Sequence, residues 1–176
     1  STGTTLNSLC EKLPFTLSIK GVDFSQAMLD RAQEKLNKWS GQHTITLLCQ
    51  NADQVNYQNS SVVILNFILQ FIDVKERAQL LRKIYREMNK GGMLFVSEKI
   101  RFPQAQMQET VTKLYEAFKA SSGYCRTEIA KKKESLDNVL VSLTRHEQEQ
   151  MFKDVGFFCV EPVLQWHNFM SWVLIK

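Results

Sequence analysis

The stretch Ile19-Lys20-Gly21-Val22-Asp23-Phe24-Ser25 decides the fold that we predict for this 176-residue chain. It is a short apolar run that ends in an acid, and a helical pattern begins directly after it. Ser25 is suited to cap that helix, because its side-chain oxygen can accept hydrogen bonds from first-turn N–H groups. A strand that ends in a carboxylate holds it where α/β proteins bind nucleotides. Asp23 is therefore predicted to bind ribose hydroxyls, and Gly3 precedes it by the twenty residues typical of a glycine-rich turn.

The composition is that of a globular protein with one core. A hydrophobic content of 44% and a net charge of +4 are ordinary values, and 176 residues can bury a sizeable core. The mild positive charge permits an acidic ligand or a nucleic acid without requiring either. The longest apolar runs, 61–69 and 93–96, are far shorter than the roughly 20 residues that a membrane-spanning helix needs. No interaction with a membrane is predicted.

The cysteines and histidines predict no metal site. Cys10, Cys49, Cys125 and Cys159 are widely separated and form no C-x-x-C pair, and the three histidines do not cluster. This distribution predicts free thiols in a reducing, cytoplasmic compartment and no disulfide. The chain also has no Ser/His/Asp or Cys/His arrangement that would indicate a covalent nucleophile.

Strands and amphipathic helices alternate up to residue 97. The predicted helices are 4–12, 26–39 and 75–88, and the predicted strands are 16–22, 45–48, a strand within 61–71, and 93–97. This alternation predicts a Rossmann-like, doubly wound and mostly parallel sheet. The run Val62-Val63-Ile64-Leu65 predicts a central strand covered on both faces. Polar residues follow the strand ends at Asp23, Asn51, Asn66 and Ser97, so a ligand is expected at that edge.

The second half of the chain departs from this alternation. Helical periodicity dominates from Gln104 to Gln150 and predicts an inserted lid or a dimer surface. Two closing strands are predicted at 157–160 and 169–175. No segment is rich enough in Pro, Gly or Ser to be a linker, so residues 1–176 are predicted to form a single domain.

Several segments resemble the class I S-adenosylmethionine-dependent methyltransferase fold. Ser1-Thr2-Gly3-Thr4 resembles the end of its glycine-rich loop, Val22-Asp23 its ribose-binding acid, and Asn51-Ala52-Asp53 its adenine-side segment. The resemblance implies a site for S-adenosylmethionine or carboxy-S-adenosylmethionine, with no metal. The residues that it assigns to this site are Ser1, Gly3, Asp23, Phe24, Asn51, Ala52 and Asn66.

A closer resemblance is to the carboxy-S-adenosylmethionine synthase family, long labelled tRNA (cmo5U34) methyltransferases. It rests on segments 65–71 (LNFILQF) and 91–99 (GGMLFVSEK), on Phe118-Lys119, Gly123-Tyr124 and Glu128-Ile129, and on Gln165 with Asn168-Phe169. The resemblance implies that S-adenosylmethionine and prephenate are converted to carboxy-S-adenosylmethionine and phenylpyruvate, for modification of the wobble uridine in tRNA. It also implies a homodimer that does not bind tRNA directly.

The chain departs from the family pattern at two places. The family's arginine that binds the new carboxylate corresponds to Lys133, which keeps the charge but loses the planar two-pronged geometry. The family also has a helix, a first strand and a ligand-contacting tyrosine before the position of Ser1. The resemblance therefore implies an N-terminally truncated domain that lacks its first strand.

The residues leave other interpretations open. An ordinary methyltransferase acting on a small molecule or tRNA needs no carboxylate-binding cation, and a non-catalytic binding or dimerisation module needs no complete donor site. Asp23 is alternatively a surface acid, Asn51 a turn residue, and Asn66 part of a structural amide network. The run Lys131-Lys132-Lys133 is alternatively a solvated helix face. Periodic aromatic residues, Tyr115, Phe118 and Tyr124, are predicted to be core or dimer contacts.

Overall fold

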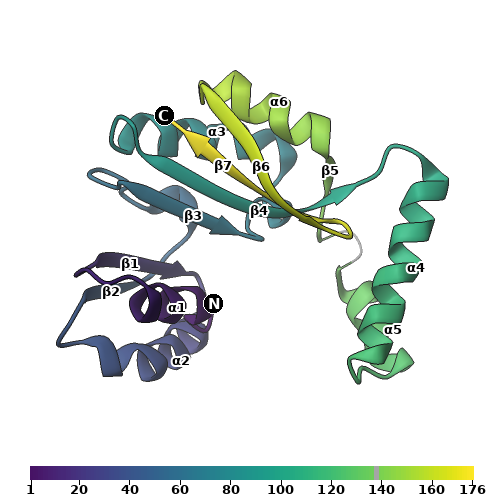
Figure 1. Ribbon diagram of the computed structural model, residues 1–176, viewed down its shortest axis with the longest axis horizontal. Coiled ribbons are helices and arrows are strands. Elements are labelled where there is room, and N and C mark those ends of the chain that lie inside the picture. Colours follow the sequence, from purple (N-terminus) through teal and green to yellow (C-terminus); the bar gives the residue numbers. More distant parts are fainter. Residues whose placement is uncertain (137–138) are drawn as a thin grey trace. The chain divides into compact units, whose positions relative to one another are not determined.

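A computed structural model describes residues 1–136 and 139–176, and the side chains of Ile129 and Lys133 also lie outside the description. The chain divides into two compact units, Ser1–Asn56 and Tyr57–Lys176, each of which is described by itself (Figure 1). Two compact units can be lobes of one domain, so the single-domain prediction stays a prediction. None of the described helices is both long and apolar enough to cross a membrane.

The first unit is a two-stranded parallel sheet covered by helices. Its elements are α1 (Thr4–Lys12), β1 (Ser18–Asp23), α2 (Gln26–Leu36), β2 (Thr44–Cys49) and the short 3₁₀-helices η1 (Asn37–Trp39) and η2 (Ala52–Gln54). β1 and β2 run parallel in register from the Ser18–Thr44 pair to the Asp23–Cys49 pair. α2 contacts both strands and α1. The predicted alternation of strands and helices is confirmed in this unit.

Gly3 allows the start of α1 to approach α2 closely. It precedes α1 with a φ of 71°, in the left-handed region that favours glycine. A Cβ atom at this position would lie 3.0 Å from the Cβ of Ala32 and 3.2 Å from its Cα. The packing of α1 on α2 therefore depends on the absence of a side chain at residue 3.

The second unit is a mixed five-stranded sheet with helices. Its elements are β3 (Val62–Asn66), η3 (Leu69–Phe71), α3 (Val74–Glu87), β4 (Met93–Arg101), α4 (Ala105–Ser121), α5 (Arg126–Leu136), β5 (Leu143–Thr144), α6 (Arg145–Val155), β6 (Cys159–Trp166) and β7 (Phe169–Ile175). The strand order is β3-β4-β7-β6, with β5 pairing the end of β4. β3 and β4 are parallel, as predicted, and the closing hairpin β6-β7 is antiparallel.

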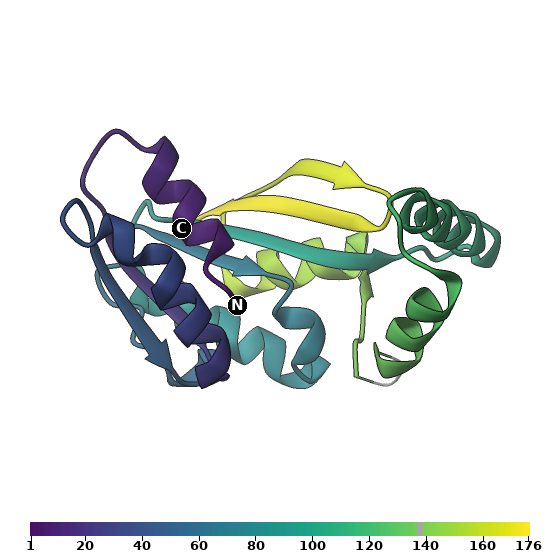
Figure 2. The same cartoon turned by 90° about the horizontal axis from the view of Figure 1, so that it is seen from below.

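The core of this unit lies between one face of the sheet and two helices. α3 and α6 contact each other and cover the same face in both ribbon views (Figure 2). Leu81 and Ile84 of α3 are completely buried, and the Phe152 ring meets the Trp172 ring edge-on at 5.7 Å. The periodic apolar residues of both helices thus provide the core that the sequence predicts.

β3 differs from the buried central strand that its sequence predicts. It is the first strand of its sheet, and among the described residues it pairs with β4 alone. Val63 and Leu65 are buried, but Val62 is 50% exposed. The prediction of cover on both faces is therefore wrong for this structure, because the described helices cover β3 on the side of Val63 and Leu65.

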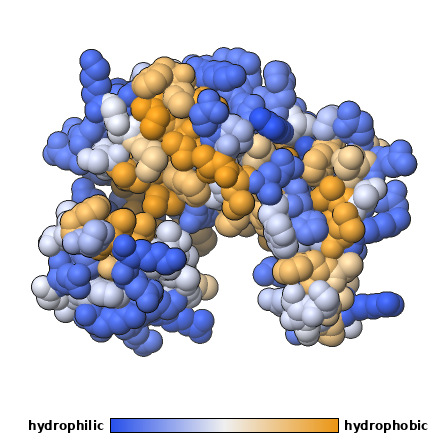
Figure 3. Space-filling model, viewed as in Figure 1, coloured by the Kyte–Doolittle hydropathy of each residue, from blue (hydrophilic) through white to orange (hydrophobic). Residues whose placement is uncertain are grey.

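The helical insertion forms an arm beyond the sheet. α4 and α5 extend from the end of β4, and they contact each other (Figures 1 and 2). Met107 and Leu114 of α4 are 48% and 54% exposed, and Val163 and Leu164 of β6 are 53% and 62% exposed. Apolar surface is visible along this arm in the space-filling view (Figure 3).

Replacement of Gly3 tests the close packing of α1. We expect Gly3→Ala to lower the free energy of unfolding by about 1–3 kcal/mol, because alanine is strained at positive φ and its methyl group would crowd Ala32. The matched control is Gly41→Ala, since a Cβ there meets no atom within 4 Å. Denaturant titration of both variants measures the difference. Equal stability of the two variants would contradict this role for Gly3.

Candidate functional site

The Asp23 carboxylate lies at the carboxyl end of β1 and is held by nearby backbone. Its side chain is 20% exposed. Oδ1 accepts a hydrogen bond from the Ser25 N–H at 2.9 Å, and Oδ2 accepts one from the Ser1 backbone nitrogen. Ser25 occupies the N-cap position of α2, but its side chain makes no capping bond. The predicted Ser25 cap is therefore wrong, because the turn before α2 is ordered by the Asp23 carboxylate instead.

Four of the predicted donor-site residues lie at one edge of the first unit. Asp23 pairs with Cys49 at the ends of β1 and β2, and the Gln50 N–H donates to the Asp23 carbonyl at 3.1 Å. Phe24 follows with a ring that is 79% exposed. Asn51 and Ala52 follow β2 at the same edge. This edge joins a partly exposed carboxylate, an exposed aromatic ring and a polar turn.

Asn51 has a local structural role. Its side chain accepts from the backbone of Gln54, and the Gln54 Oε1 accepts from the Asn51 N–H at 3.2 Å. This reciprocal arrangement is a capping box at the start of η2. Gly3 likewise has a packing role against Ala32. Ligand contacts of both residues stay predictions.

Asn66 lies at the carboxyl end of β3 in the second unit. It ends β3 opposite Ser97 of β4. The next residue, Phe67, has a φ of 57°, which is uncommon for a residue other than glycine. Its N–H donates to the Ser97 carbonyl at 2.7 Å. This turn carries the chain from the strand end into η3.

Glu98 is a buried acid whose carboxylate accepts hydrogen bonds from the turn after β3. It is 2% exposed, and its carboxylate accepts from the N–H groups of Ile68, Leu69 and Gln70 at 3.0, 2.7 and 3.1 Å. Burial raises the pKa of Glu98 to about 7, against the opposing effects of these N–H groups and of Arg77. No role for Glu98 is predicted from the sequence. The feature of the sequence that could have indicated this role is the position of Glu98, an acid directly after the apolar strand predicted at 93–97.

Gln70 and Arg77 extend this buried polar network. The Gln70 Oε1 accepts from the Lys99 N–H at 3.3 Å, and its carbonyl accepts from the Val141 N–H at 2.9 Å. Arg77 is 1% exposed and donates to the carbonyls of Ile72 and Val141 at 2.9 and 2.7 Å. Burial lowers the pKa of Arg77, and the charges of Glu98 and Asp73 raise it. The network joins η3 to the segment that precedes β5.

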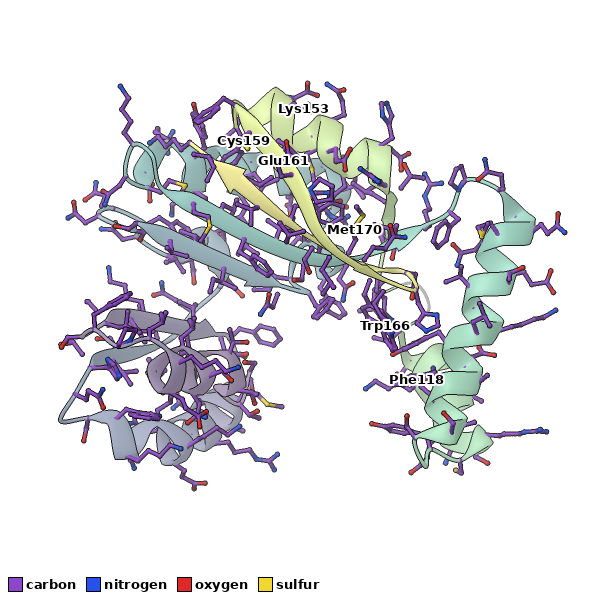
Figure 4. The ribbon with its side chains drawn as sticks, in the orientation of Figure 1. Phe118, Lys153, Cys159, Glu161, Trp166 and Met170 are labelled. Carbon is purple, nitrogen blue, oxygen red and sulfur yellow. The ribbon has the colours of Figure 1, made fainter. Side chains whose placement is uncertain are left out.

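A cluster of aromatic rings and lysines lies beside this network. We call it the Lys99 cluster, and it comprises Lys99, Tyr115, Phe118, Lys119, Trp166, His167 and Phe169. The rings come from α4 and from the β6-β7 hairpin. Phe118 and Trp166 lie close together in Figure 4, and their rings meet edge-on with centroids 4.7 Å apart. The sequence predicted the α4 aromatic residues as packing contacts, and it did not associate them with Lys99.

Lys133 lies in the helix α5, but its side chain is outside the described residues. Its predicted role as the carboxylate-binding cation stays a prediction. Across the described residues there is no group of three His, Cys, Asp or Glu that could hold a metal ion. Two surface hollows lie away from the predicted site residues, one on α3 and one beside α2 and β2.

The family comparison first defines the class of protein. Residues 1–92 match the family model described as "Methyltransferase domain". The structure titled "PigF with SAH" has a TM-score of 0.69 at 15% identity, covering 99% of this chain and 48% of that one. A SAM-dependent methyltransferase from Aquifex aeolicus has a TM-score of 0.61 at 15% identity, covering 99% of this chain and 77% of that one. The fold is therefore that of the class I S-adenosylmethionine-dependent methyltransferases.

Two curated relatives then define the family. The carboxy-S-adenosyl-L-methionine synthase of Trichodesmium erythraeum is 47% identical over 176 residues, covering 100% of this chain and 70% of that protein. The synthase of Desulfotalea psychrophila is 38% identical over 177 residues, covering 100% of this chain and 72% of that protein. The chain belongs to the carboxy-S-adenosyl-L-methionine synthase family, whose members are S-adenosylmethionine-dependent enzymes.

The buried Glu98 carboxyl predicts a pH dependence of stability. Its pKa is raised from 4.5 to about 7, so the folded state binds the proton more tightly than the unfolded chain. This contribution is fully present below pH 4.5 and is lost as the pH rises through 7. We expect the stability of wild type relative to Glu98→Gln to grow as the pH falls from 8 to 5, by up to ~1.4 kcal/mol per unit.

Denaturant titrations at a series of pH values measure this difference. Glu161→Gln is the control, because Glu161 is exposed on β6 and its replacement should leave the pH profile parallel to that of wild type. A difference between wild type and Glu98→Gln that is the same at pH 5 and pH 8 would rule out the raised pKa.

Proposed function

We propose that this chain converts S-adenosylmethionine and prephenate to carboxy-S-adenosylmethionine and phenylpyruvate, for the modification of tRNA wobble uridine. The observation that carries the proposal is 47% identity over the whole chain to a carboxy-S-adenosyl-L-methionine synthase. In this reaction the sulfonium methyl carbon captures the carbon dioxide lost from prephenate, while the methyl proton and the hydroxyl group of the ring leave as water. The protein is proposed to act in the cytoplasm without binding tRNA directly.

The first unit is proposed to bind the ribose and base of the donor. A carboxylate has about four acceptor positions, and Asp23 uses one on each oxygen for the Ser25 N–H and the Ser1 backbone nitrogen. Each oxygen therefore retains capacity for a ribose hydroxyl. The exposed ring of Phe24 offers an apolar surface to an adenine base. Ser1, Gly3, Asn51, Ala52 and Asn66 are proposed as the other contacts.

Lys133 is proposed as the cation that holds the new carboxylate. A lysine provides a point charge in place of the family's arginine fork, so we expect a bond with less directional preference. The arm formed by α4 and α5 is proposed as the dimer surface, because its exposed apolar residues Met107 and Leu114 are available for burial.

The donor role of Asp23 is tested by an isosteric change. We expect Asp23→Asn in the protein that carries this chain to weaken S-adenosylmethionine binding about tenfold, because the hydroxyl-accepting charge is lost. Isothermal calorimetry measures the affinity. Asp30→Asn, an exposed acid on α2, is the matched control and should bind as wild type does. Unchanged affinity of Asp23→Asn would exclude the ribose role.

The chemical outcome is tested by mass spectrometry of the ligand released on denaturation. The proposal predicts a nucleoside heavier than S-adenosylmethionine by one carboxyl group, together with consumption of added prephenate. Recovery of S-adenosylmethionine alone, without prephenate turnover, would contradict the proposed reaction.

An ordinary methyltransferase is the second candidate function. Lys133 in place of the family's arginine favours it, since methyl transfer requires no carboxylate-binding fork. Transfer of a radiolabelled methyl group to a small molecule or tRNA would support this candidate, and the absence of transfer alongside prephenate turnover would exclude it.

A further inference from the structure

Two lysine amines approach the same aromatic ring at the carboxyl end of β4. The Lys99 Nζ lies 6.0 Å from the Tyr115 ring centroid and 5.4 Å from that of Phe169. The Lys119 Nζ lies 4.6 Å from the Tyr115 ring centroid. Cation–π contacts hold an ammonium group within about 6 Å of a ring. Two positive charges from different elements are therefore held over one phenol ring.

The two amines repel each other and make no ion pair among the described residues. Lys99 is half-buried, and burial lowers its pKa, with further lowering by the charges of Lys119 and Lys132. On the same helix as Lys119, Glu109 pairs with Lys113. An anion that pairs with these amines would offset their repulsion as well as add a favourable interaction.

The rings around these amines leave apolar surface exposed. The Tyr115 and Phe169 centroids are 5.1 Å apart, and Phe118 meets Trp166 edge-on at 4.7 Å. Phe118 and Trp166 are nevertheless 44% and 41% exposed. Exposed aromatic surface next to paired cations suits a ligand that has both a ring and a negative charge.

The cluster begins next to the predicted donor residue Asn66. Phe67 directly follows Asn66, and its ring meets the Phe169 ring edge-on at 5.7 Å. Phe169 in turn lies under the Lys99 amine. The aromatic contacts thus run without a break from the end of β3 to the two lysines. A molecule bound at Lys99 and Lys119 would lie on the same edge of the sheet as Asn66.

We propose that the Lys99 cluster binds the second substrate of the enzyme, a cyclic carboxylate, with Lys99 and Lys119 holding its charge and the aromatic rings contacting its ring. This inference rests on the proposed function, because prephenate is a six-membered ring that carries two carboxylates. Lys99 and Lys119 act as binding residues for this substrate and are separate from Lys133, the proposed cation for the product carboxylate.

Removal of each charge tests the site. We expect Lys99→Met and Lys119→Met to raise the KM for prephenate at least tenfold while S-adenosylmethionine affinity stays within about twofold of wild type. Lys113→Met is the control, because Lys113 is on α4 but pairs with Glu109. Lys119 lies on the helical arm, so Lys119→Met remains informative if Lys99→Met fails to fold. An unchanged KM in both variants would overturn the proposal while leaving the proposed function intact.

A binding measurement separates this inference from the proposed function. Trp166 lies in the cluster, so titration with prephenate or with phenylpyruvate should change its fluorescence, and Trp166→Phe should abolish that change. A fluorescence change that is lost in Lys99→Met and Lys119→Met supports the site even if no carboxylated product forms. No response to either ring carboxylate in wild-type protein would overturn it.

Discussion

The buried carboxylate of Glu98 organises the second unit. It accepts hydrogen bonds from three successive N–H groups, those of Ile68, Leu69 and Gln70. These donors belong to the start of η3, where a short helix has no backbone partners for its N–H groups. Without an acceptor, the buried N–H groups of Leu69 and Gln70 would each cost about 1–3 kcal/mol. Glu98 therefore makes the abrupt turn after β3 possible, and the turn places Asn66 at the sheet edge.

The same constraint orders the residues on both sides of the proposed site. Lys99 directly follows Glu98, and the Lys99 N–H donates to the Gln70 side chain. Because the Gln70 N–H in turn donates to Glu98, the same turn holds the backbone of Lys99. Phe67 lies within that turn and contacts Phe169, over which the Lys99 amine lies. One buried acid thus connects the end of β3 with the Lys99 cluster. The LNFILQF and GGMLFVSEK segments contact each other twice, through the pairing of β3 with β4 and through the hydrogen bonds to the Glu98 carboxylate.

Periodicity predicted the elements well where a single face is buried. The structure has α1 at Thr4–Lys12 and β7 at Phe169–Ile175, as the apolar patterns indicated. β4 extends beyond its predicted end at Ser97. The strand can continue through Glu98 because N–H groups at the start of η3 donate hydrogen bonds to the buried carboxylate. The positions of Asp23 in the first unit and of Asn66 in the second were each predictable, because polar residues at the carboxyl ends of parallel strands lie at the edge of their own sheet. The Lys99 cluster was not, because its members come together only through the fold of α4 against the β6-β7 hairpin.

The lysine charges of the Lys99 cluster favour a ligand site over a protein contact. A second copy of the chain covering Phe118 and Trp166 would also bury the amines of Lys99 and Lys119. Buried ammonium groups without carboxylate partners cost several kcal/mol each, so such a partner would have to supply acids at two fixed points. A small cyclic carboxylate meets both requirements at once, because its charge pairs with the amines while its ring covers the aromatic surface. A dimer formed through the outer residues of the arm, as proposed for Met107 and Leu114, would leave this cluster open to substrate.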